Sequence, residues 1–389
     1  MASFYEFFAG GGMARAGLGT EWDCLFANDF DQMKAATYEA NWGIDHFICG
    51  DVAKIQTSDL PGRADLAWAS FPCQDLSLAG DYRGLGNAAS TIRTRSGTFW
   101  PFWALIKELK EEDRAPHMVV LENVYGVLTS RGGKDFAAIC SALADADYRF
   151  GAVVIDAVHF VPQSRRRVFF IAVDPHCNLP DSLLTPRPSE DWHPRTLVNA
   201  SANLSPSTHK KLLWWNVPAP AKRNMVFSDI LEDQPKGVRW HTREETERLL
   251  GLMTPINHAK LEAAKASGRR TVGGVYKRTR ADAAGRKQQR AEVRFDGVAG
   301  CLRTPRGGSS RQTILVVEGS KVSSRLVSPR EAARLMGLSD DYKLPIRYND
   351  AYHVAGDGLC VPAVRHIAEA ILEPIILSTE RSVRLLAAE

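Results

Sequence analysis

Short apolar runs alternate with longer amphipathic stretches over the first 175 residues, and this pattern predicts strands separated by helices. Glycine, proline or acidic residues follow most of the apolar runs, as expected where strands end. The predicted strands lie at residues 4–8, 24–27, 47–49, 64–69, 118–121, 149–155 and 168–173, and the clearest helices at 98–110 and 136–144. Strands and helices in this order predict an α/β fold with a parallel, doubly wound sheet.

The first three predicted strands end in residues that suit a nucleoside ligand. A glycine turn at residues 10–12 joins the first strand to a helix, so backbone N–H groups can approach a carboxylate or a phosphate there. Asp29 and Phe30 follow the second strand, and Asp51 follows the third. Such acids accept hydrogen bonds from ribose, and an aromatic ring can stack on a base. Together these residues predict an adenosine-containing cofactor, although the glycines lack the full dinucleotide fingerprint.

Cys73 stands at the end of the fourth strand, where Pro72 stops the extended run. A thiol at that edge of a sheet can serve as a nucleophile, but most isolated cysteines only fill space in a core. The chain has seven cysteines, widely scattered and without a Cys-x-x-Cys pair. This spacing argues against a disulfide framework and against a zinc site, and no metal is expected.

Two groups of polar residues flank the later strands. Glu122 directly follows the fifth strand, and three arginines, Arg165 to Arg167, directly precede the last one. Because side chains alternate along an extended chain, we expect Arg165 and Arg167 to point the same way, as a fork for a carbonyl or a phosphate. The stretch 79–97 is rich in glycine and arginine and lacks apolar periodicity, which predicts a binding loop that closes over a ligand.

Composition and charge narrow the class of protein. The chain is 44% hydrophobic and 24% charged, has no apolar run of about 18 residues, and lacks the pattern of a signal peptide. We therefore expect a cytoplasmic protein that does not enter a membrane. Residues 191–330 carry 26 Lys and Arg against 12 Asp and Glu, whereas the remainder carries 23 against 33. A basic segment joined to an acidic body predicts a nucleic-acid partner.

Six blocks of sequence occur in an order that is typical of one enzyme family. They lie at residues 8–12 (Phe-Ala-Gly-Gly-Gly), 71–74 (Phe-Pro-Cys-Gln), 122–124 (Glu-Asn-Val), 163–167 (Gln-Ser-Arg-Arg-Arg), 328–337 (Ser-Pro-Arg-Glu-Ala-Ala-Arg-Leu-Met-Gly) and 356–362 (Gly-Asp-Gly-Leu-Cys-Val-Pro). In order and spacing these blocks resemble those of the cytosine-C5 DNA methyltransferases. The resemblance covers well over half of the chain and implies the fold of the S-adenosylmethionine-dependent methyltransferases.

The resemblance also implies a covalent mechanism and assigns roles to four residues. Cys73 would add to C6 of the target cytosine, because C5 is a poor nucleophile until the ring is activated. Glu122, with a pKa raised by burial, would bond N3 and the exocyclic amine. Arg165 and Arg167 would hold the ring O2 and orient the other catalytic groups, with Arg167 the first choice for the direct contact. The target cytosine must leave the base stack to reach such a site.

The methyl donor that the family implies is S-adenosylmethionine. The residues expected to bind it are Phe8, Ala9, Gly10, Gly12, Asp29, Phe30, Asp51, Val52, Pro72 and Asp357. Of these, Asp29 is assigned to the ribose, Phe30 and Asp51 to the adenine, and the glycine turn to the methionine end. Asp357 stands where the family usually has asparagine, and its extra negative charge would weaken a contact with the carboxylate of the cofactor. Asp29 stands where glutamate is common.

Three segments are expected: a catalytic domain at 1–190, a basic target-recognition domain at 191–345, and a segment at 346–389 that returns to the first domain. Double-stranded DNA is the expected partner, and the candidate contacts are Ser77, Arg83, Arg303, Arg306, Arg311 and Gln312. The last four suit base edges, because arginine pairs with guanine and glutamine with adenine, but each could equally bind a phosphate. We expect a monomer of restriction–modification type, and the sequence leaves open whether an endonuclease acts on the same site.

Two other interpretations stay open from the sequence. A transfer-RNA methyltransferase of the same family is expected to carry Cys-Phe-Thr in its recognition region, whereas Cys301 here precedes Leu302 and Arg303. A DNA-binding regulator that kept the fold without the activity would have no need of a nucleophile and a partner acid.

Overall fold

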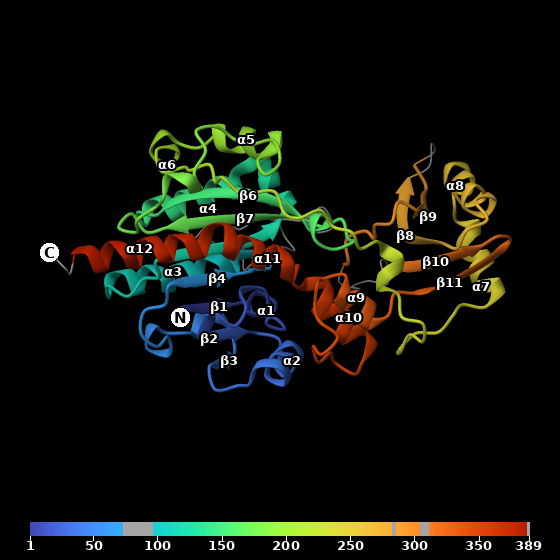
Figure 1. The fold of residues 1–389 in the computed structure, drawn as a ribbon, viewed down its shortest axis with the longest axis horizontal. Coiled ribbons are helices and arrows are strands. Elements are labelled where there is room, and N and C mark those ends of the chain that lie inside the picture. The colour runs from blue at the N-terminus through green and yellow to red at the C-terminus, as the bar shows by residue number, and fades with distance from the viewer. Residues whose placement is uncertain (73–95, 282–284, 304–310, 387–389) are drawn as a thin grey trace. The chain divides into compact units, whose positions relative to one another are not determined.

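The computed structural model of this chain describes residues 1–72, 96–281, 285–303 and 311–386. These residues form two compact units, each of which can be followed by colour in Figure 1. Unit 1 comprises Met1–Ile155, Arg166–Pro220 and Ala363–Glu389, and unit 2 comprises Asp156–Arg165 and Ala221–Pro362. A short segment of unit 2, residues 156–165, thus interrupts unit 1. It ends at Arg165, the first of the three successive arginines.

The boundaries between the units differ from those expected at 190 and 345. Residues 191–220 stay with unit 1 because they bind its later strands: the Phe150 N–H donates to the Lys211 carbonyl at 2.9 Å. Residues 346–362 stay with unit 2 because Tyr352 is buried in its core. Charge composition marked the basic region but could not locate these packing contacts.

Unit 1 is built on a seven-stranded sheet. Its strands are β1 (Ala2–Phe7), β2 (Trp22–Asp29), β3 (Phe47–Cys49), β4 (Leu66–Ala69), β5 (Met118–Val124), β6 (Arg149–Asp156) and β7 (Arg166–Val173), in the spatial order β3-β2-β1-β4-β5-β7-β6. β1 is parallel to β2 and β4, and β4 is parallel to β5, which confirms the predicted doubly wound sheet. β7 is antiparallel to β5. The other neighbour of β7 in the sheet is β6, and only residues 157–165 link the two strands. This link is too short for the helical crossover of about a dozen residues that parallel neighbours need.

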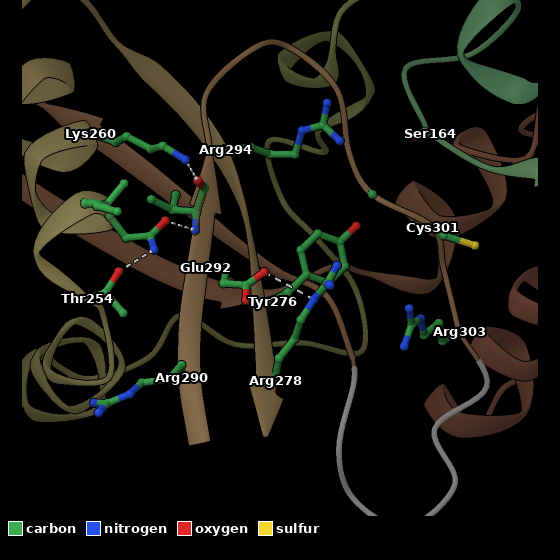
Figure 2. A pocket seen from close by; sticks show the side chains of 14 residues that line it. Ser164, Thr254, Lys260, Tyr276, Arg278, Arg290, Glu292, Arg294, Cys301 and Arg303 are labelled. Atoms are coloured by element: carbon green, nitrogen blue, oxygen red, sulfur yellow. Dashed lines mark hydrogen bonds and ion pairs between the residues drawn. The ribbon is translucent and has the colours of Figure 1, made fainter. Parts of the chain in front are cut away.

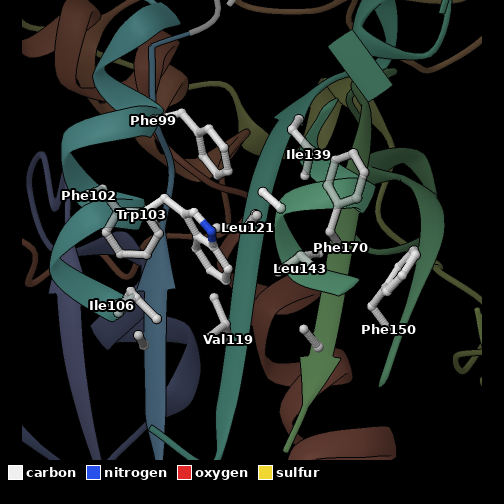
Figure 3. Close-up of a cluster of buried hydrophobic side chains, with 14 of the residues drawn as sticks. Phe99, Phe102, Trp103, Ile106, Val119, Leu121, Ile139, Leu143, Phe150 and Phe170 are labelled. Carbon is white, nitrogen blue, oxygen red and sulfur yellow. The ribbon is translucent and has the colours of Figure 1, made fainter. Parts of the chain in front are cut away.

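Helices cover both faces of this sheet. They are α1 (Met13–Leu18), α2 (Gln32–Trp42), α3 (Phe99–Glu111), α4 (Lys134–Asp145), α5 (Arg195–Ala202), α6 (Pro206–His209), α11 (Val361–Ile367), the π-helical turn η9 (Ala368–Leu372) and α12 (Glu373–Leu386). Figure 3 shows the core on the α3 and α4 face, where Phe102 and Ile106 of α3 and Val119 and Leu121 of β5 are buried in one cluster. The spacing of four in the helix and of two in the strand places each pair on one face.

The opposite face of the sheet receives the C-terminal helices. Phe4 and Trp22 lie on this face, and the Trp22 indole donates to the Glu373 carboxylate at 3.1 Å. Arg365 of α11 donates to the Leu18 carbonyl at the end of α1. These contacts return the end of the chain to the face of the sheet at β1 and β2.

Unit 2 contains a four-stranded antiparallel sheet in the order β11-β10-β8-β9. Its elements are α7 (Arg243–Gly251), α8 (Pro255–Ala266), β8 (Thr271–Ala281), β9 (Lys287–Arg294), β10 (Thr313–Glu318), β11 (Lys321–Leu326), α9 (Pro329–Arg334) and α10 (Tyr348–Asp357). Leu249 of α7 and Leu261 of α8 share a buried cluster with Val275 and Val293 of the β8–β9 hairpin. No helix in the described part of the chain is long and apolar enough to cross a membrane.

Candidate active site and cofactor edge

The residues that lead to Cys73 are fixed at the carboxyl end of β4. Phe71 is 2% exposed, and its carbonyl accepts a hydrogen bond from the Asn123 side chain at 3.2 Å. Asn123 lies near the end of β5, the neighbouring parallel strand. Cys73 itself, Ser77, Arg83 and the expected binding loop up to residue 95 lie outside the described residues. The described chain stops at a half-buried Pro72, directly before the thiol.

Glu122 forms an ion pair with Arg167 at the same end of the sheet. The Glu122 Oε1 and the Arg167 Nε are 2.9 Å apart, and their side chains are only 11% and 17% exposed. The register of the antiparallel strands explains the pair, because Arg167 of β7 lies opposite Val124 of β5, two residues beyond Glu122. Arg167 also donates from Nη1 to the Arg166 carbonyl at 2.9 Å, and a guanidinium fixed at this edge is suited to a polar oxygen of a ligand.

Arg165 does not share this position. Its guanidinium is 3% exposed and donates to three carbonyls of unit 2: Leu302 at 3.1 Å, Gly356 at 3.0 Å and Gly358 at 2.7 Å. β7 begins only at Arg166, so the alternation that we expected to align Arg165 with Arg167 starts one residue too late. These contacts favour the orienting role for Arg165 and agree with the choice of Arg167 for the direct contact with the ring.

The glycine turn at residues 10–12 lies at the end of the sheet where the cofactor is expected, which we call the cofactor edge. Its backbone conformation is one that few residues other than glycine adopt. The φ angles of Gly10 and Gly12 are +58° and +78°, in the left-handed region. The Gly10 N–H donates to the Asp29 carboxylate at 2.8 Å, and the Trp42 indole donates to the Gly11 carbonyl at 3.0 Å. A Cβ at Gly10 would meet no atom within 4 Å, whereas a Cβ at Gly12 would overlap the Trp42 indole. The turn therefore has open space on one side and a packed wall on the other.

The expected adenosine residues line the adjoining strand ends. Asp29 is buried, and its second oxygen accepts the Asp31 N–H at 2.9 Å. Burial raises the pKa of Asp29, against the lowering influence of Lys34 and these N–H donors. The Phe30 ring is 76% exposed, as a stacking platform requires, and Asp51 caps a short turn by accepting the Ala53 N–H at 3.0 Å. The structure brings Asp29, Phe30 and Asp51 to one edge of the sheet.

The structure also gives the positions of four further residues that were expected to bind the cofactor. Phe8 is half-buried with a φ of +57°, Ala9 is buried against β2, and Val52 is buried beneath the third strand end. Asp357 is the last residue of α10 and is exposed, within unit 2.

Glu6 is a site residue that the sequence analysis missed. It lies in β1, just before the glycine turn, and is 1% exposed, and the backbone N–H groups of Arg15 and Ala14 at the start of α1 act to lower the pKa of its carboxyl. Burial raises the pKa of its carboxyl to about 8, which outweighs the lowering effect of Arg15. The available signal was one acid inside an apolar strand, since polar residues in such runs are rarely buried without a specific partner.

The pKa of Glu6 predicts how stability depends on pH. A carboxyl whose pKa rises from 4.5 to about 8 on folding contributes stability below pH 4.5 that is lost as the pH rises toward 8, with a slope of at most about 1.4 kcal/mol per pH unit. Glu6→Gln should remove this slope, so the variant gains stability relative to the parent protein between these pH values. Denaturant unfolding across this range measures it, with the exposed Glu21→Gln as control. Parallel curves for parent and Glu6→Gln would contradict the assignment.

Gly12→Ala should damage both the turn and cofactor binding. The left-handed φ costs a residue with a Cβ about 1–2 kcal/mol, and overlap with the Trp42 indole adds about 1–3 kcal/mol. Gly62→Ala is the matched control, because Gly62 has a φ of +65° and no atom within 4 Å of its Cβ position. We expect calorimetry with S-adenosylhomocysteine to show binding weakened about tenfold or more in Gly12→Ala alone. Equal losses of stability in both variants would show that packing against Trp42 has no effect.

The expected DNA contacts are scattered in unit 2. Arg303 is exposed, and Arg306 lies outside the described residues. Arg311 is half-buried, lies over the Tyr348 ring and bonds the Asn349 side chain. Gln312 is fully buried, and its Oε1 accepts the Tyr276 hydroxyl at 3.2 Å. A base contact by Gln312 is therefore not supported, because β10 begins at the next residue and carries the side chain into the core.

Comparison with known proteins identifies relatives along nearly the whole chain. The pattern of the C-5 cytosine-specific DNA methylase family matches residues 2–373. The chain is 26% identical over 379 residues to the Type II methyltransferase M.BsuFI of Bacillus subtilis, which covers 97% of this chain and 74% of that protein. It is 24% identical over 387 residues to the Type II methyltransferase M.NlaX of Neisseria lactamica, which covers 98% and 100%.

Solved structures share the fold. The S. pombe Dnmt2 methyltransferase aligns with a TM-score of 0.59 at 14% identity, over 96% of this chain and 99% of that one. The Entamoeba histolytica methyltransferase EhMeth aligns with a TM-score of 0.60 at 12% identity, also over 96% and 99%. At these identities the likeness concerns the fold alone.

Proposed function

The chain belongs to the C-5 cytosine-specific DNA methylase family, and from this premise we propose that it methylates C5 of a cytosine rotated out of duplex DNA at a specific site. The type II names of its relatives favour a place in a restriction–modification system. The single observation that supports the mechanism best is the buried pair of Glu122 and Arg167 at the strand end beside the approach to Cys73.

The cofactor edge fits S-adenosylmethionine, which when bound supplies the methyl group. Gly10 leaves open space where its missing side chain would be, and the Phe30 ring is exposed for an adenine. Asp29 and Asp51 would hold the ribose and the adenine amine, and the glycine turn would pack against the methionine end. Two carboxylates, an open glycine turn and one exposed aromatic ring are the groups that suit an adenosine with an amino-acid tail.

The protein groups would act on the cytosine in a fixed order. The Cys73 thiolate adds to C6 and forms a carbon–sulfur bond, which gives C5 the reactivity of an enamine carbon. Glu122, with a proton taken up from solvent, would donate a strong hydrogen bond to N3, and Arg167 would donate to the ring O2. After C5 is methylated, its proton leaves to a base and the carbon–sulfur bond breaks. The thiolate is thereby regenerated.

The test is transfer of labelled methyl groups to duplex DNA and, in parallel, to transfer RNA. We expect label in DNA, and sequencing of the product would identify the site and the modified cytosine. DNA that contains 5-fluorocytosine provides a second arm: fluorine cannot leave as a proton, so the adduct should persist and be found on the Cys73 peptide by mass spectrometry. Label in RNA but not in DNA would overturn the assignment of DNA as the substrate. An adduct on another residue would overturn the assignment of Cys73 as the nucleophile.

A further inference from the structure

One face of the β8–β9 hairpin gathers cationic side chains around a pocket of about 750 Å³ in unit 2 (Figure 2). Among the described residues, five cations line this pocket against one carboxylate, that of Glu292: they are Lys260, Arg278, Arg290, Arg294 and Arg303. We call the hairpin part of the lining the arginine face; it consists of Tyr276, Arg278, Arg290, Glu292 and Arg294. An excess of positive charge in a concave surface attracts anions.

The strand register holds two of these cations side by side. Arg278 of β8 lies directly opposite Arg290 of β9, and like charges in that position destabilise a hairpin. The register cannot slip to separate them, because Val275 and Val293 pair on the other face and are buried in the core. The fold thus keeps both cationic side chains on the same face of the hairpin.

The guanidiniums are held by partners that an anion can replace. Arg278 Nε lies 3.3 Å from Glu292 Oε2, with the two side chains 44% and 34% exposed, and Arg290 donates to the Gln288 side chain. Exposed contacts of this kind contribute at most about 1 kcal/mol. Arg294, by contrast, makes two bonds with Asp296. Arg278 and Arg290 are therefore the members of the arginine face best suited to an incoming anion.

The uncharged polar groups of the pocket are already used inside the protein. Asn257 accepts the Val293 N–H at 3.0 Å and donates to the Thr254 hydroxyl at 2.9 Å. The Tyr276 hydroxyl donates to the buried Gln312, and a Cβ at Gly300 would overlap that hydroxyl. Base edges are read by fixed donors and acceptors, whereas phosphates are bound by flexible cations. This pocket offers mainly the second kind of group.

We propose that the arginine face binds backbone phosphates of the DNA substrate through Arg278 and Arg290, and that it supplies affinity but no sequence selectivity. The proposal rests on the proposed function only in taking duplex DNA as the ligand. Affinity and selectivity would then come from different residues of unit 2. The arginine face would supply affinity, and other residues of the unit would supply selectivity.

The experiment compares Arg278→Gln/Arg290→Gln with Arg243→Gln/Arg248→Gln, a control that removes two exposed arginines from α7. Fluorescence anisotropy with short labelled duplexes is measured between about 50 and 200 mM salt. We expect the hairpin variant to bind about tenfold or more weakly and its slope of log K against log salt to fall by about 2, one for each lost phosphate contact. The control should match the parent protein, and an unchanged slope in the hairpin variant would overturn the proposal.

Two further measurements separate the alternatives. Sequencing of methylated plasmid should give the same sites for the hairpin variant, with a raised KM for DNA and an unchanged kcat; an altered site pattern would show base reading and overturn the proposal. Arg278→Lys/Arg290→Lys keeps both charges, so it should retain the salt slope of the parent protein. It therefore tests charge even where the Arg278→Gln/Arg290→Gln variant fails to fold. Tighter binding of duplex RNA than of DNA would overturn the choice of ligand. Anisotropy needs no turnover, so a parent protein that fails to methylate DNA would refute the proposed function separately.

Discussion

Replacement of Cys73 by serine should lower methyl transfer to DNA by at least about 10³-fold, because a serine hydroxyl is almost un-ionised near neutral pH whereas a thiol is readily converted to a thiolate. Serine is nearly isosteric, so the approach to the site should persist. The chain that leads to the site is held at Phe71, whose carbonyl accepts a hydrogen bond from Asn123. Binding of DNA and of S-adenosylhomocysteine should therefore stay within about threefold of the parent protein.

Cys49→Ser is the matched control, since it makes the same sulfur-to-oxygen change at an exposed cysteine of β3. Labelled methyl transfer under single-turnover conditions measures the chemical step in both variants. Retention of a tenth or more of the activity by Cys73→Ser would remove the thiolate from the mechanism. A loss of DNA binding in Cys73→Ser would instead show that the substitution had disturbed the approach to the site.

Glu122→Gln should lower kcat by about 10²- to 10⁴-fold, the range usual for loss of a general acid. Glutamine keeps the shape of the side chain but can neither protonate N3 nor carry the charge that faces Arg167. The loss should fall on kcat more than on KM, because charge develops on the ring only as the thiolate adds. Steady-state kinetics on a defined duplex measures the two constants separately.

Arg167→Met should be strongly impaired as well, and the double variant should be little worse than the worse single variant. Groups that act as one unit behave in this non-additive way, and the separation of 2.9 Å makes Glu122 and Arg167 such a unit. Arg166→Met is the control, since Arg166 is the exposed neighbour on the same strand. Additive losses in the double variant would mean that the two residues act independently.

Much of unit 1 follows from local sequence. Apolar runs of strand length, separated by amphipathic stretches, predicted all seven strands of its sheet. Since parallel strands carry their carboxyl ends to one edge, the residues after each run had to meet there, and Asp29, Phe30 and Asp51 do so. The same rule placed Glu122 at the edge where the approach to Cys73 ends.

The long-range pairings could not be predicted in this way. β7 runs against β5, and only this register sets Arg167 beside Glu122. Arg165 and Gln312 were chosen by residue type, yet the first is engaged by three carbonyls and the second is buried under Tyr276. A polar residue near a strand end shows nothing locally of which distant backbone groups will take its hydrogen bonds.

The sequence by itself thus determined the family and the parallel sheet, and it predicted the nucleophile and its partner acid, because periodicity and ordered motifs are local properties of the chain. The tertiary structure alone decided that Glu6 is buried behind the glycine turn, that Arg165 and Arg167 have different partners, and that Arg278 and Arg290 face each other. These facts depend on which surfaces are excluded from water and which strands pair. Both are set by contacts between residues far apart in sequence.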